Sequence, residues 1–508
     1  GLGLGAAPLP LALWVGVAAL CGVAALLVKV SGLLSRRWRQ HRALLPFPGP
    51  HRHWLLGHLQ EFSHDGTDLA KCVIWANTYP YAFPLWFGPF IAFLNICHPD
   101  YVKTVLNSSE PKDDIVYQFL VPWIGDGLLV SNGQKWFRHR RLLTRGFHFD
   151  ILKPYVKVMA DSTKIMLDKW ERLCCESGSL EIYQHVSLLT LDNIMRCAFS
   201  YQSNCQTLSN NSYIQAVYEL TYLCNHRFHT FPYHSNLIFH LSPHGYRFRK
   251  ACRLAHRHTD EVIRQRKEAL RSEKELEKIS GKRYLDFLDI LLCTQDEEGK
   301  GLSDEEIRAE VDTFMFEGHD TTASGISWIL HTLANHPQHQ DLCRAEIQQV
   351  LQGRQHIDWE SLGKLPYTTM CIKECLRLYP PVPGISRRLT KPVHFPDGRA
   401  LPAGSLVGVS VYCLHRNASV WENPEIFDPL RFSPENSMNR HSHAFIPFSA
   451  GQRNCIGQQF AMNEMKIVTA LTLSRFQLAV DEAKLPSAIP QLVLRSVNGI
   501  HLILSPLA

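Results

Sequence analysis

The sequence predicts a mainly α (α+β) protein in which one transmembrane helix precedes a large helical domain with small β-sheets. Three observations support this prediction. Residues 6–28 are almost wholly apolar and carry no charge, the chain beyond residue 50 is dominated by long helical periods, and strand patterns are clearest in residues 393–414 and 492–504. With 508 residues, 45% of them hydrophobic, the chain can bury a large core without disulfide bonds.

The N-terminal apolar run has the length of a membrane anchor. It covers roughly 23 residues, and a helix needs about 20 to span the hydrocarbon core. Basic residues follow it, which by the positive-inside rule places the rest of the chain on the cytoplasmic side; they are Lys29, Arg36, Arg37, Arg39 and Arg42. The alternative is a cleaved signal peptide, but its apolar core would be only about 7–15 residues long and would follow a basic segment.

Proline separates this anchor from the rest of the chain. Residues 46–50 read Pro-Phe-Pro-Gly-Pro and cannot continue a helix, because proline fixes φ and restrains the residue before it. No later change in composition suggests another boundary. The predicted organisation is an anchor at residues 1–30, a basic and proline-rich linker at 31–50, and one globular domain at 51–508.

Charge and cysteine usage exclude two classes of protein. Lys and Arg number 53 against 47 Asp and Glu, and a net charge of +6 on so long a chain is no footprint of nucleic-acid binding. The 15 cysteines are odd in number and show no repeating spacing, unlike a disulfide framework. We therefore expect mostly free thiols in a reducing compartment.

One helix is marked at both ends. Ser303 and Glu306 have the spacing of a capping box, and Asp304 and Glu305 favour the positive end of a helix. No proline follows until Pro337, so the helix can run for roughly 33 residues, or about 50 Å. A helix of that length would cross the whole domain.

Two hairpins are predicted from turn residues. In residues 393–414 the turn is Pro396-Asp397-Gly398, and in residues 492–504 it is Asn498-Gly499.

The most specific pattern is Phe448–Gly457, which reads Phe-Ser-Ala-Gly-Gln-Arg-Asn-Cys-Ile-Gly. Gly451 and Gly457 allow the backbone to approach a flat ligand closely, and Cys455 precedes an apolar helix that begins near Gln458. A thiolate at that place would face the positive end of the helix. The alternative is an ordinary buried cysteine. The pattern Phe-x-x-Gly-x-Arg-x-Cys-x-Gly resembles the haem loop of the cytochrome P-450 superfamily, which implies that Cys455 binds the iron of haem b through its sulfur.

Other segments resemble the same superfamily in the expected order, so the cytochrome P-450 fold around a buried haem is implied. Glu374, Arg377 and Arg431 resemble its buried Glu-Arg-Arg cluster, to which we assign a structural role.

The resemblance also implies partners for the two haem propionates. They are Trp136 and Arg140 of a Trp-x-x-x-Arg pair, Arg453, and Arg387, although Arg388 is adjacent. Buried carboxylates need charged or N–H partners, so these residue types suit that role.

Within the long helix, Glu317-Gly318-His319-Asp320-Thr321-Thr322 resembles the oxygen-activation motif of the superfamily. The resemblance implies that Thr321 hydrogen-bonds dioxygen and that Asp320 helps to deliver protons. The alternative is a polar face on an ordinary buried helix.

Glu317 is the informative departure, because most members carry Ala or Gly there. A carboxylate facing an apolar pocket costs several kcal/mol unless it is neutralised. Glu at this place resembles family 4, the fatty-acid ω-hydroxylases, and the chain is most similar to subfamily B. In many members this Glu forms an ester to a haem methyl group. The alternative is a protonated or water-bound Glu317 with no covalent link.

The resemblance implies a haem-thiolate monooxygenase that hydroxylates fatty acids and related small lipophilic compounds, preferentially at the terminal (ω) carbon, with dioxygen. Three alternatives stay open: a xenobiotic-oxidising monooxygenase of broad specificity, a haem-binding protein that does not oxidise, and a haem-thiolate isomerase. Expected pocket walls are Phe314, residues 119–124, residues 382–385 and Val497.

The basic segment Lys135–Arg145 suits an acidic electron donor, although it could be an ordinary solvated helix face. The implied donor is the NADPH-cytochrome reductase, a diflavin enzyme, with cytochrome b5 as a second candidate. No Gly-rich dinucleotide fingerprint follows a strand, so we do not expect NADPH to bind this chain. The expected location is the endoplasmic reticulum membrane, with a single span and the catalytic domain facing the cytoplasm.

Overall fold

The computed structural model describes residues 11–176, 178–207, 211–272, 285–295, 299–354 and 356–507. Helices dominate these residues. The α-helices are α1 (Leu11–Leu44), α2 (Asp68–Thr78), α3 (Pro99–Leu106), α4 (Val121–Ile124), α5 (Gly133–Thr144), α6 (Phe149–Leu173), α7 (Tyr183–Ala198), α8 (Ser212–His229), α9 (Asn236–Leu241), α10 (Pro243–Ala269), α12 (Phe287–Cys293), α13 (Asp304–Asn335), α14 (Pro337–Leu351), α15 (Trp359–Leu362), α16 (Pro366–Leu378), α17 (Val411–Leu414), α18 (Pro434–Ser437) and α19 (Gln458–Arg475).

The strands form small sheets, as predicted. They are β1 (Ala82–Trp86), β2 (Ala92–Ile96), β3 (Leu180–Glu181), β4 (Gly384–Arg388), β5 (Val393–His394), β6 (Ala400–Leu401), β7 (Leu406–Ser410), β8 (Phe476–Val480), β9 (Ala488–Gln491), β10 (Val493–Ser496) and β11 (His501–Pro506). The largest sheet has the order β1-β2-β7-β4, in which only β2 and β7 run parallel. The others are β3-β11-β8, β10-β9 and β5-β6.

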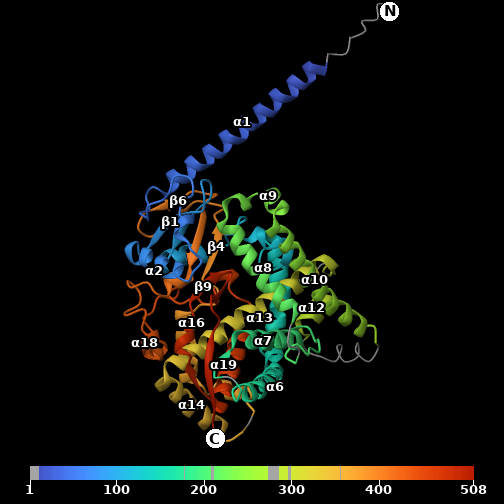
Figure 1. Ribbon diagram of the computed structural model, residues 1–508, viewed down its shortest axis with the longest axis vertical. Coiled ribbons are helices and arrows are strands. Elements are labelled where there is room, and N and C mark those ends of the chain that lie inside the picture. The colour runs from blue at the N-terminus through green and yellow to red at the C-terminus, as the bar shows by residue number, and fades with distance from the viewer. Residues whose placement is uncertain are drawn as a thin grey trace, which may run out of the picture.

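Helix α1 projects away from the rest of the molecule (Figure 1). Within the described residues, Trp14–Leu44 is the one helix long and apolar enough to cross a membrane, with a mean hydropathy of 2.2 over its most apolar window. Residues 1–10 of the predicted anchor lie outside the described residues. Helix α1 continues to Leu44, through most of the predicted linker, because no proline lies between Leu11 and Pro46.

The last turn of α1 reaches the folded domain. Leu44 and Phe47 are buried in one apolar cluster with residues of the largest sheet, among them Leu94 and Val407. The domain therefore begins before residue 50, where the proline-rich stretch turns the chain onto this cluster.

Helix α13 confirms the prediction of a single long helix. It has 32 residues, and its capping box is complete: the Ser303 hydroxyl accepts a hydrogen bond from the Glu306 N–H at 3.2 Å, and the Glu306 carboxylate accepts one from the Ser303 N–H at 2.9 Å. Pro337 opens the next helix. Helix α13 crosses the middle of the domain and packs against α7, α10, α16 and α19 (Figure 1).

The first predicted hairpin is confirmed only around its turn. Strands β5 and β6 pair antiparallel on either side of Pro396-Asp397-Gly398. Strand β7 leaves this hairpin and joins the largest sheet, and residues 411–414 form helix α17, whose first turn is capped by the Ser410 hydroxyl.

The second predicted hairpin is wrong. Strand β10 pairs with β9 across a turn at Leu492, where φ is 53°, whereas β11 joins β3 and β8 in another sheet. The Asn498 side chain explains the difference. It donates to the Leu485 carbonyl at 2.6 Å and accepts from the Ser487 N–H at 3.1 Å, so Asn498-Gly499 is tied to the loop before β9.

The Glu-Arg-Arg cluster is buried, as predicted. Arg377 donates to both carboxylate oxygens of Glu374, at 2.7 and 2.8 Å, and Arg431 lies 3.3 Å from the same carboxylate. Arg377 also donates to the carbonyls of His415 and Pro424, at 2.8 and 2.7 Å. These bonds fix the long segment after α17 against α16, which is the structural role expected of the cluster.

Candidate functional site

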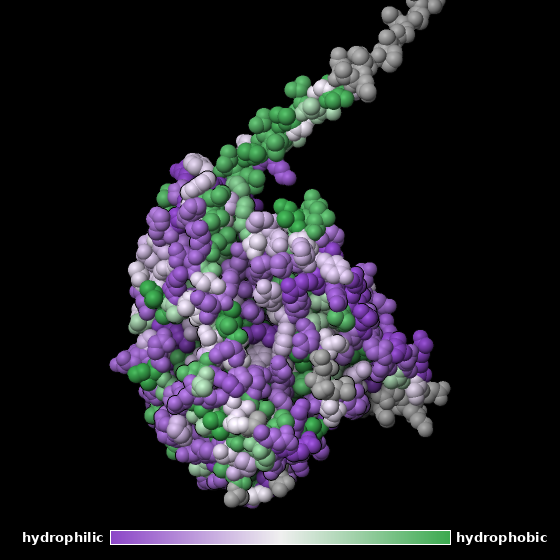
Figure 2. Space-filling view, viewed as in Figure 1, coloured by the Kyte–Doolittle hydropathy of each residue, from purple (hydrophilic) through white to green (hydrophobic). Residues whose placement is uncertain are grey.

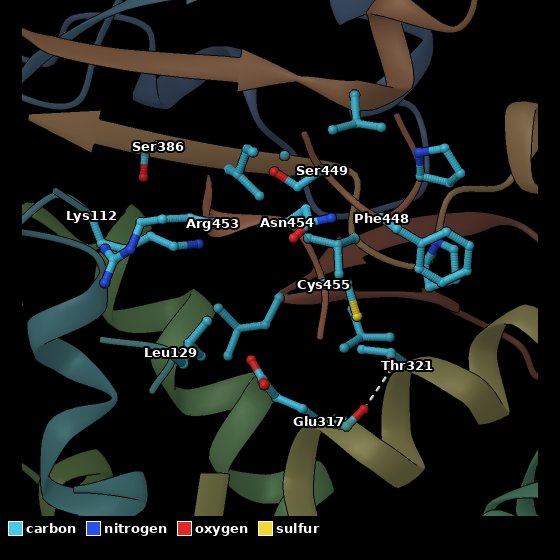
Figure 3. Close-up of a pocket in the computed structure, with 18 of the residues that line it drawn as sticks. Lys112, Leu129, Glu317, Thr321, Ser386, Phe448, Ser449, Arg453, Asn454 and Cys455 are labelled. Carbon is cyan, nitrogen blue, oxygen red and sulfur yellow. Dashed lines mark hydrogen bonds between the residues drawn. The ribbon is translucent and has the colours of Figure 1, made fainter. Parts of the chain in front are cut away.

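A cavity of about 480 Å³ lies between helix α13, the loop that precedes α19 and the largest sheet. Most of its lining is apolar, and it includes Leu85, Phe87, Phe93, Phe228, Phe314, Ile385, Val409, Phe448 and Val493. Side chains from α13 and from the loop before α19 enter the cavity from opposite walls (Figure 3).

Cys455 is held at the end of its loop by backbone contacts. Its N–H donates to the Phe448 carbonyl at 2.9 Å, and helix α19 begins three residues later. Gly451 has a φ of 72°, and a Cβ there would collide with the Leu106 carbonyl oxygen. The sulfur of Cys455 faces the cavity, so its exposed surface belongs to the cavity and not to the outside of the protein (Figure 3).

The surroundings of the sulfur favour the neutral thiol when nothing is bound to it. Burial and the nearby Glu317 carboxylate raise the pKa of Cys455 to about 11, although the Gly457 backbone, Arg140 and Lys112 act in the opposite direction. A metal cation bound to the sulfur would supply the missing positive charge and stabilise the thiolate. The site therefore suits a thiolate-bound metal cofactor.

Three of the four predicted propionate partners line the cavity, namely Trp136, Arg140 and Arg453. Arg140 donates to the carbonyl and the side-chain oxygen of Asn454, at 2.7 and 2.8 Å, which joins helix α5 to the Cys455 loop. The Arg453 guanidinium lies 4.6 Å from the Trp136 ring centroid and donates to the Ser131 carbonyl.

Arg387 is not among the lining residues. It is buried in β4, and its Nη1 donates to the Ser386 carbonyl at 2.9 Å. The adjacent Arg388 points elsewhere and pairs with Asp114.

Lys112 is a charged lining residue that no sequence pattern predicts. Its ammonium donates to the Tyr117 hydroxyl at 3.2 Å and enters the cavity beside Arg453 (Figure 3). Burial lowers its pKa well below the usual value, and Arg387 and Arg453 lower it further. A single lysine before Asp113 belongs to no motif, so this position cannot be recognised from the sequence.

These cations fit a ligand that carries two acidic groups. Lys112, Arg140, Arg387 and Arg453 lie in and behind one wall, and burial also lowers the pKa of Arg453, to about 10. So many positive charges in one buried place repel one another unless anions bind between them. The two propionates of a haem would meet this need, at the wall beside the sulfur ligand.

The predicted face of α13 is confirmed, since Phe314, Glu317 and Thr321 all line the cavity. The Thr321 hydroxyl donates to the Glu317 carbonyl at 2.6 Å (Figure 3). Gly318 allows close packing beside them, because a Cβ there would lie 2.7 Å from the Ile194 side chain, which would have to shift. Burial raises the pKa of Glu317 to about 7, with Lys112 opposing the shift, so its carboxyl group is readily neutralised.

Asp320 is not among the lining residues. Its carboxylate is buried, and both of its oxygens accept hydrogen bonds from the guanidinium of Arg495 on strand β10, each at 2.7 Å. The helix therefore presents Thr321 to the cavity and Asp320 to the C-terminal sheet.

The expected pocket walls are confirmed in part. Phe314, Leu120 of the 119–124 segment, and Val382, Gly384 and Ile385 all line the cavity. The prediction that Val497 lines the cavity is wrong, because Val497 is 53% exposed and lies outside the cavity. Leu492 and Val493 line it instead, since the turn at Leu492 brings the start of β10 inward.

Comparisons with known proteins agree with this site. The family model described as Cytochrome P450 matches residues 47–503. The chain is 56% identical to cytochrome P450 4B1 of Rattus norvegicus over 498 residues, which cover 98% of this chain and 97% of that protein. It is 55% identical to the human (Homo sapiens) cytochrome P450 4B1 over 94% of each chain, and 56% identical to cytochrome P450 4A6 of Oryctolagus cuniculus over 96% and 95%.

Proposed function

The chain belongs to the cytochrome P450 family and resembles its family 4, subfamily B, and from this premise we propose that it hydroxylates fatty acids and related small lipophilic compounds at the terminal carbon. It is a monooxygenase with a haem cofactor. The observation that carries the proposal is the placement of the Cys455 sulfur in an apolar cavity, across from Glu317 and Thr321.

Several residues of the chain would hold the haem. Cys455 supplies the sulfur ligand, while Trp136, Arg140, Arg453 and Lys112 hold the propionates and Arg387 supports them from behind. When bound, haem supplies the activation of dioxygen and the insertion of one oxygen atom into a C–H bond, and a thiolate ligand favours O–O cleavage. The surrounding apolar side chains exclude water, which prevents side reactions with water.

Proton delivery is assigned to two neighbouring residues of α13. The Thr321 hydroxyl can turn from the Glu317 carbonyl to donate its proton into the cavity, because a hydroxyl rotates freely about its C–O bond. Asp320 is the acid next to it and can pass a proton toward Thr321 when its contact with Arg495 opens. Gly318 leaves room beside this pair.

Glu317 is assigned as a covalent attachment point for the haem. Its carboxyl group enters the cavity from α13 across from Cys455, and its raised pKa of about 7 reflects the cost of a charge there (Figure 3). An ester to a haem methyl group removes that charge permanently. Its formation removes two hydrogen atoms, an oxidation that turnover of the enzyme supplies.

The anchor and an apolar surface patch support attachment to a membrane. Leu237 and Leu241 of α9 are 68% and 75% exposed, and they form a green patch next to the base of α1 (Figure 2). Trp54 and Leu45 are also largely exposed. We assign the protein to the endoplasmic reticulum membrane with a single span, and the basic residues that end α1 support a catalytic domain on the cytoplasmic side.

Electrons are assigned to the diflavin NADPH-cytochrome reductase, with cytochrome b5 as a second donor. The basic segment on α5 supports this only in part, because Arg140 points inward and Lys135 pairs with Asp126 at 2.9 Å. Arg141 and Arg145 extend the positive surface toward solvent. Such a surface attracts an acidic donor and makes the association rate sensitive to salt.

Reconstitution tests this function. The full-length protein is combined with the reductase, NADPH, dioxygen and dodecanoate, and the products are separated by chromatography. We expect 12-hydroxydodecanoate to exceed 11-hydroxydodecanoate, and no product without NADPH. A Glu317→Ala variant should lose this preference if the ester fixes the haem rigidly. Product from the penultimate carbon alone in the unaltered protein would contradict ω-hydroxylation.

A further inference from the structure

Asn95 places an amide on an otherwise apolar part of the cavity wall. It lies in β2 and is only 9% exposed, and it lines the cavity together with Phe93, two residues earlier on the same face. Across the parallel pair its neighbour is Gly408 of β7. Within the described part of the chain the Asn95 amide has no hydrogen-bond partner, and the side chain lines the cavity.

The surroundings of this amide leave room for a ligand. A Cβ at position 408 would lie 3.4 Å from the Asn95 Oδ1, so a larger residue there would cover the amide. Gly408 keeps it open. Buried amides almost always have partners, so an amide left open toward an apolar cavity is an unfilled binding group.

The cations that line the cavity come from elements other than β2 and its neighbour β7. The cations that line it are Lys112, Arg140 and Arg453, and each already has a protein partner. Ser386, which lies beside Arg453 in Figure 3, is on β4, two strands from β2. At the usual strand spacing this is roughly 10 Å. Among the described lining residues, those on β2 and on the neighbouring strand β7 carry no positive charge.

The chemistry of an amide decides what it can bind here. Its nitrogen donates and its oxygen accepts, so an alcohol or a primary amide is satisfied completely. An ionised carboxylate would exchange its hydration shell for one neutral donor and would be repelled by the amide oxygen. The site therefore discriminates against charge.

We propose that Asn95, with the open Gly408 beside it, is the head-group subsite of the cavity. It binds the uncharged, oxygen-bearing end of a medium-chain amphiphile, an alcohol or a primary amide, in preference to an ionised carboxylate. The chain then runs along the apolar lining toward Thr321 of α13, across the cavity from Cys455. This inference rests on the proposed hydroxylation of lipophilic chains and names the substrates that the same cavity prefers.

Spectral titration of the haem-loaded, full-length protein tests the proposal. The ligands are decane, 1-decanol, decanamide and decanoate, which share one chain and differ in the head group. The unaltered protein should bind decanol and decanamide more tightly than decanoate. Asn95→Leu, which keeps the size of the side chain, should weaken decanol and decanamide about tenfold, the effect of one hydrogen bond, and leave decane within twofold.

Two further variants separate recognition from packing. Asn95→Lys should reverse the order and make decanoate the tightest of the four ligands. Phe93→Leu, a change on the same strand and face, should weaken all four ligands to a similar extent. A decanol affinity that is unchanged in Asn95→Leu, or a decane affinity that falls with it, would overturn the proposal. Product formation from decane in the unaltered protein tests hydroxylation separately, since decane carries no head group.

Discussion

The carboxylate of Asp320 and the guanidinium of Arg495 form a buried ion pair that joins helix α13 to strand β10. The Arg495 Nη2 lies 2.7 Å from each oxygen of Asp320, and the rings of Tyr218 and Tyr183 lie 4.2 and 5.4 Å from the guanidinium carbon. Burial lowers the pKa of Arg495, but the charge of Asp320 together with Tyr183 and Tyr218 more than offsets burial, so the pKa is raised. The residue next to Thr321 is therefore tied to the C-terminal sheet.

Breaking this pair from one side should be costly. Arg495→Leu leaves the Asp320 carboxylate buried without its partner, which should lower the free energy of unfolding by roughly 3–5 kcal/mol. Urea denaturation followed by tryptophan fluorescence measures the loss. The double variant Arg495→Leu, Asp320→Leu should recover most of it, because no charge is left unpaired. Two strictly additive single losses would show that the residues do not act as a pair.

Glu317 should retain haem after the protein is unfolded. In the unaltered enzyme, after turnover, we expect a fraction of the haem to elute with the polypeptide in denaturing chromatography. In Glu317→Gln all haem should elute free, because an amide cannot form the ester. Glu464→Gln, another buried glutamate, is the matched control and should behave as the unaltered enzyme does. Complete separation of haem from the unaltered protein would rule out the ester.

Glu464 should make stability depend on pH. It is fully buried in α19, where Asn193 of α7 donates to it at 2.6 Å, and burial raises its pKa to about 8. Its ordinary pKa is 4.5. Between these values the folded state keeps a proton that the unfolded state has lost, so the folded state binds more protons and stability falls as pH rises. The contribution is complete below pH 4.5 and is gone above pH 8.

Comparison with Glu464→Gln isolates this contribution, because other buried acids such as Asp312 and Asp286 also titrate in that range. The difference in unfolding free energy between the two proteins should change by on the order of 1.4 kcal/mol per pH unit at its steepest. Parallel stability curves from pH 5 to 8 would mean that Glu464 ionises normally in the folded protein.

Gly451 should be indispensable to the loop that carries Cys455. Gly451→Ala introduces both left-handed strain and a collision with the Leu106 carbonyl, so we expect a marked loss of bound haem and of several kcal/mol of stability. Gly404 has a similar φ of 83° but open space around it, and Gly404→Ala should cost only about 1–2 kcal/mol. Equal effects of the two changes would mean that strain alone matters at Gly451.

The residues that could be predicted from the sequence are those whose spacing is fixed along one element. The capping box of α13, the shared face of Phe314, Glu317 and Thr321, and the helix start after Cys455 all follow from local patterns. Lys112 could not be predicted, because its role depends on which strands and helices surround it.

Two other differences between the predicted and the observed structure also come from tertiary contacts. The predictions that Val497 lines the cavity and that a hairpin turns at Asn498-Gly499 were wrong. The reason is that the Asn498 side chain binds the loop before β9, and β9 does not pair with the strand that follows Asn498. The sequence pattern identifies a turn there, but only the tertiary contacts decide which strand each arm of the turn joins. Asn95 likewise becomes noticeable only when Gly408 of another strand is placed beside it.

The spectrum of the reduced, carbon monoxide-bound protein tests the central claim, that the Cys455 sulfur binds the haem iron. We predict the strongly red-shifted Soret band of a thiolate ligand in the unaltered protein and in Cys293→Ser, a change at an exposed thiol. Cys455→Ser should lose that band together with all hydroxylation. A Cys455→Ser protein that keeps the band and full turnover would contradict the account.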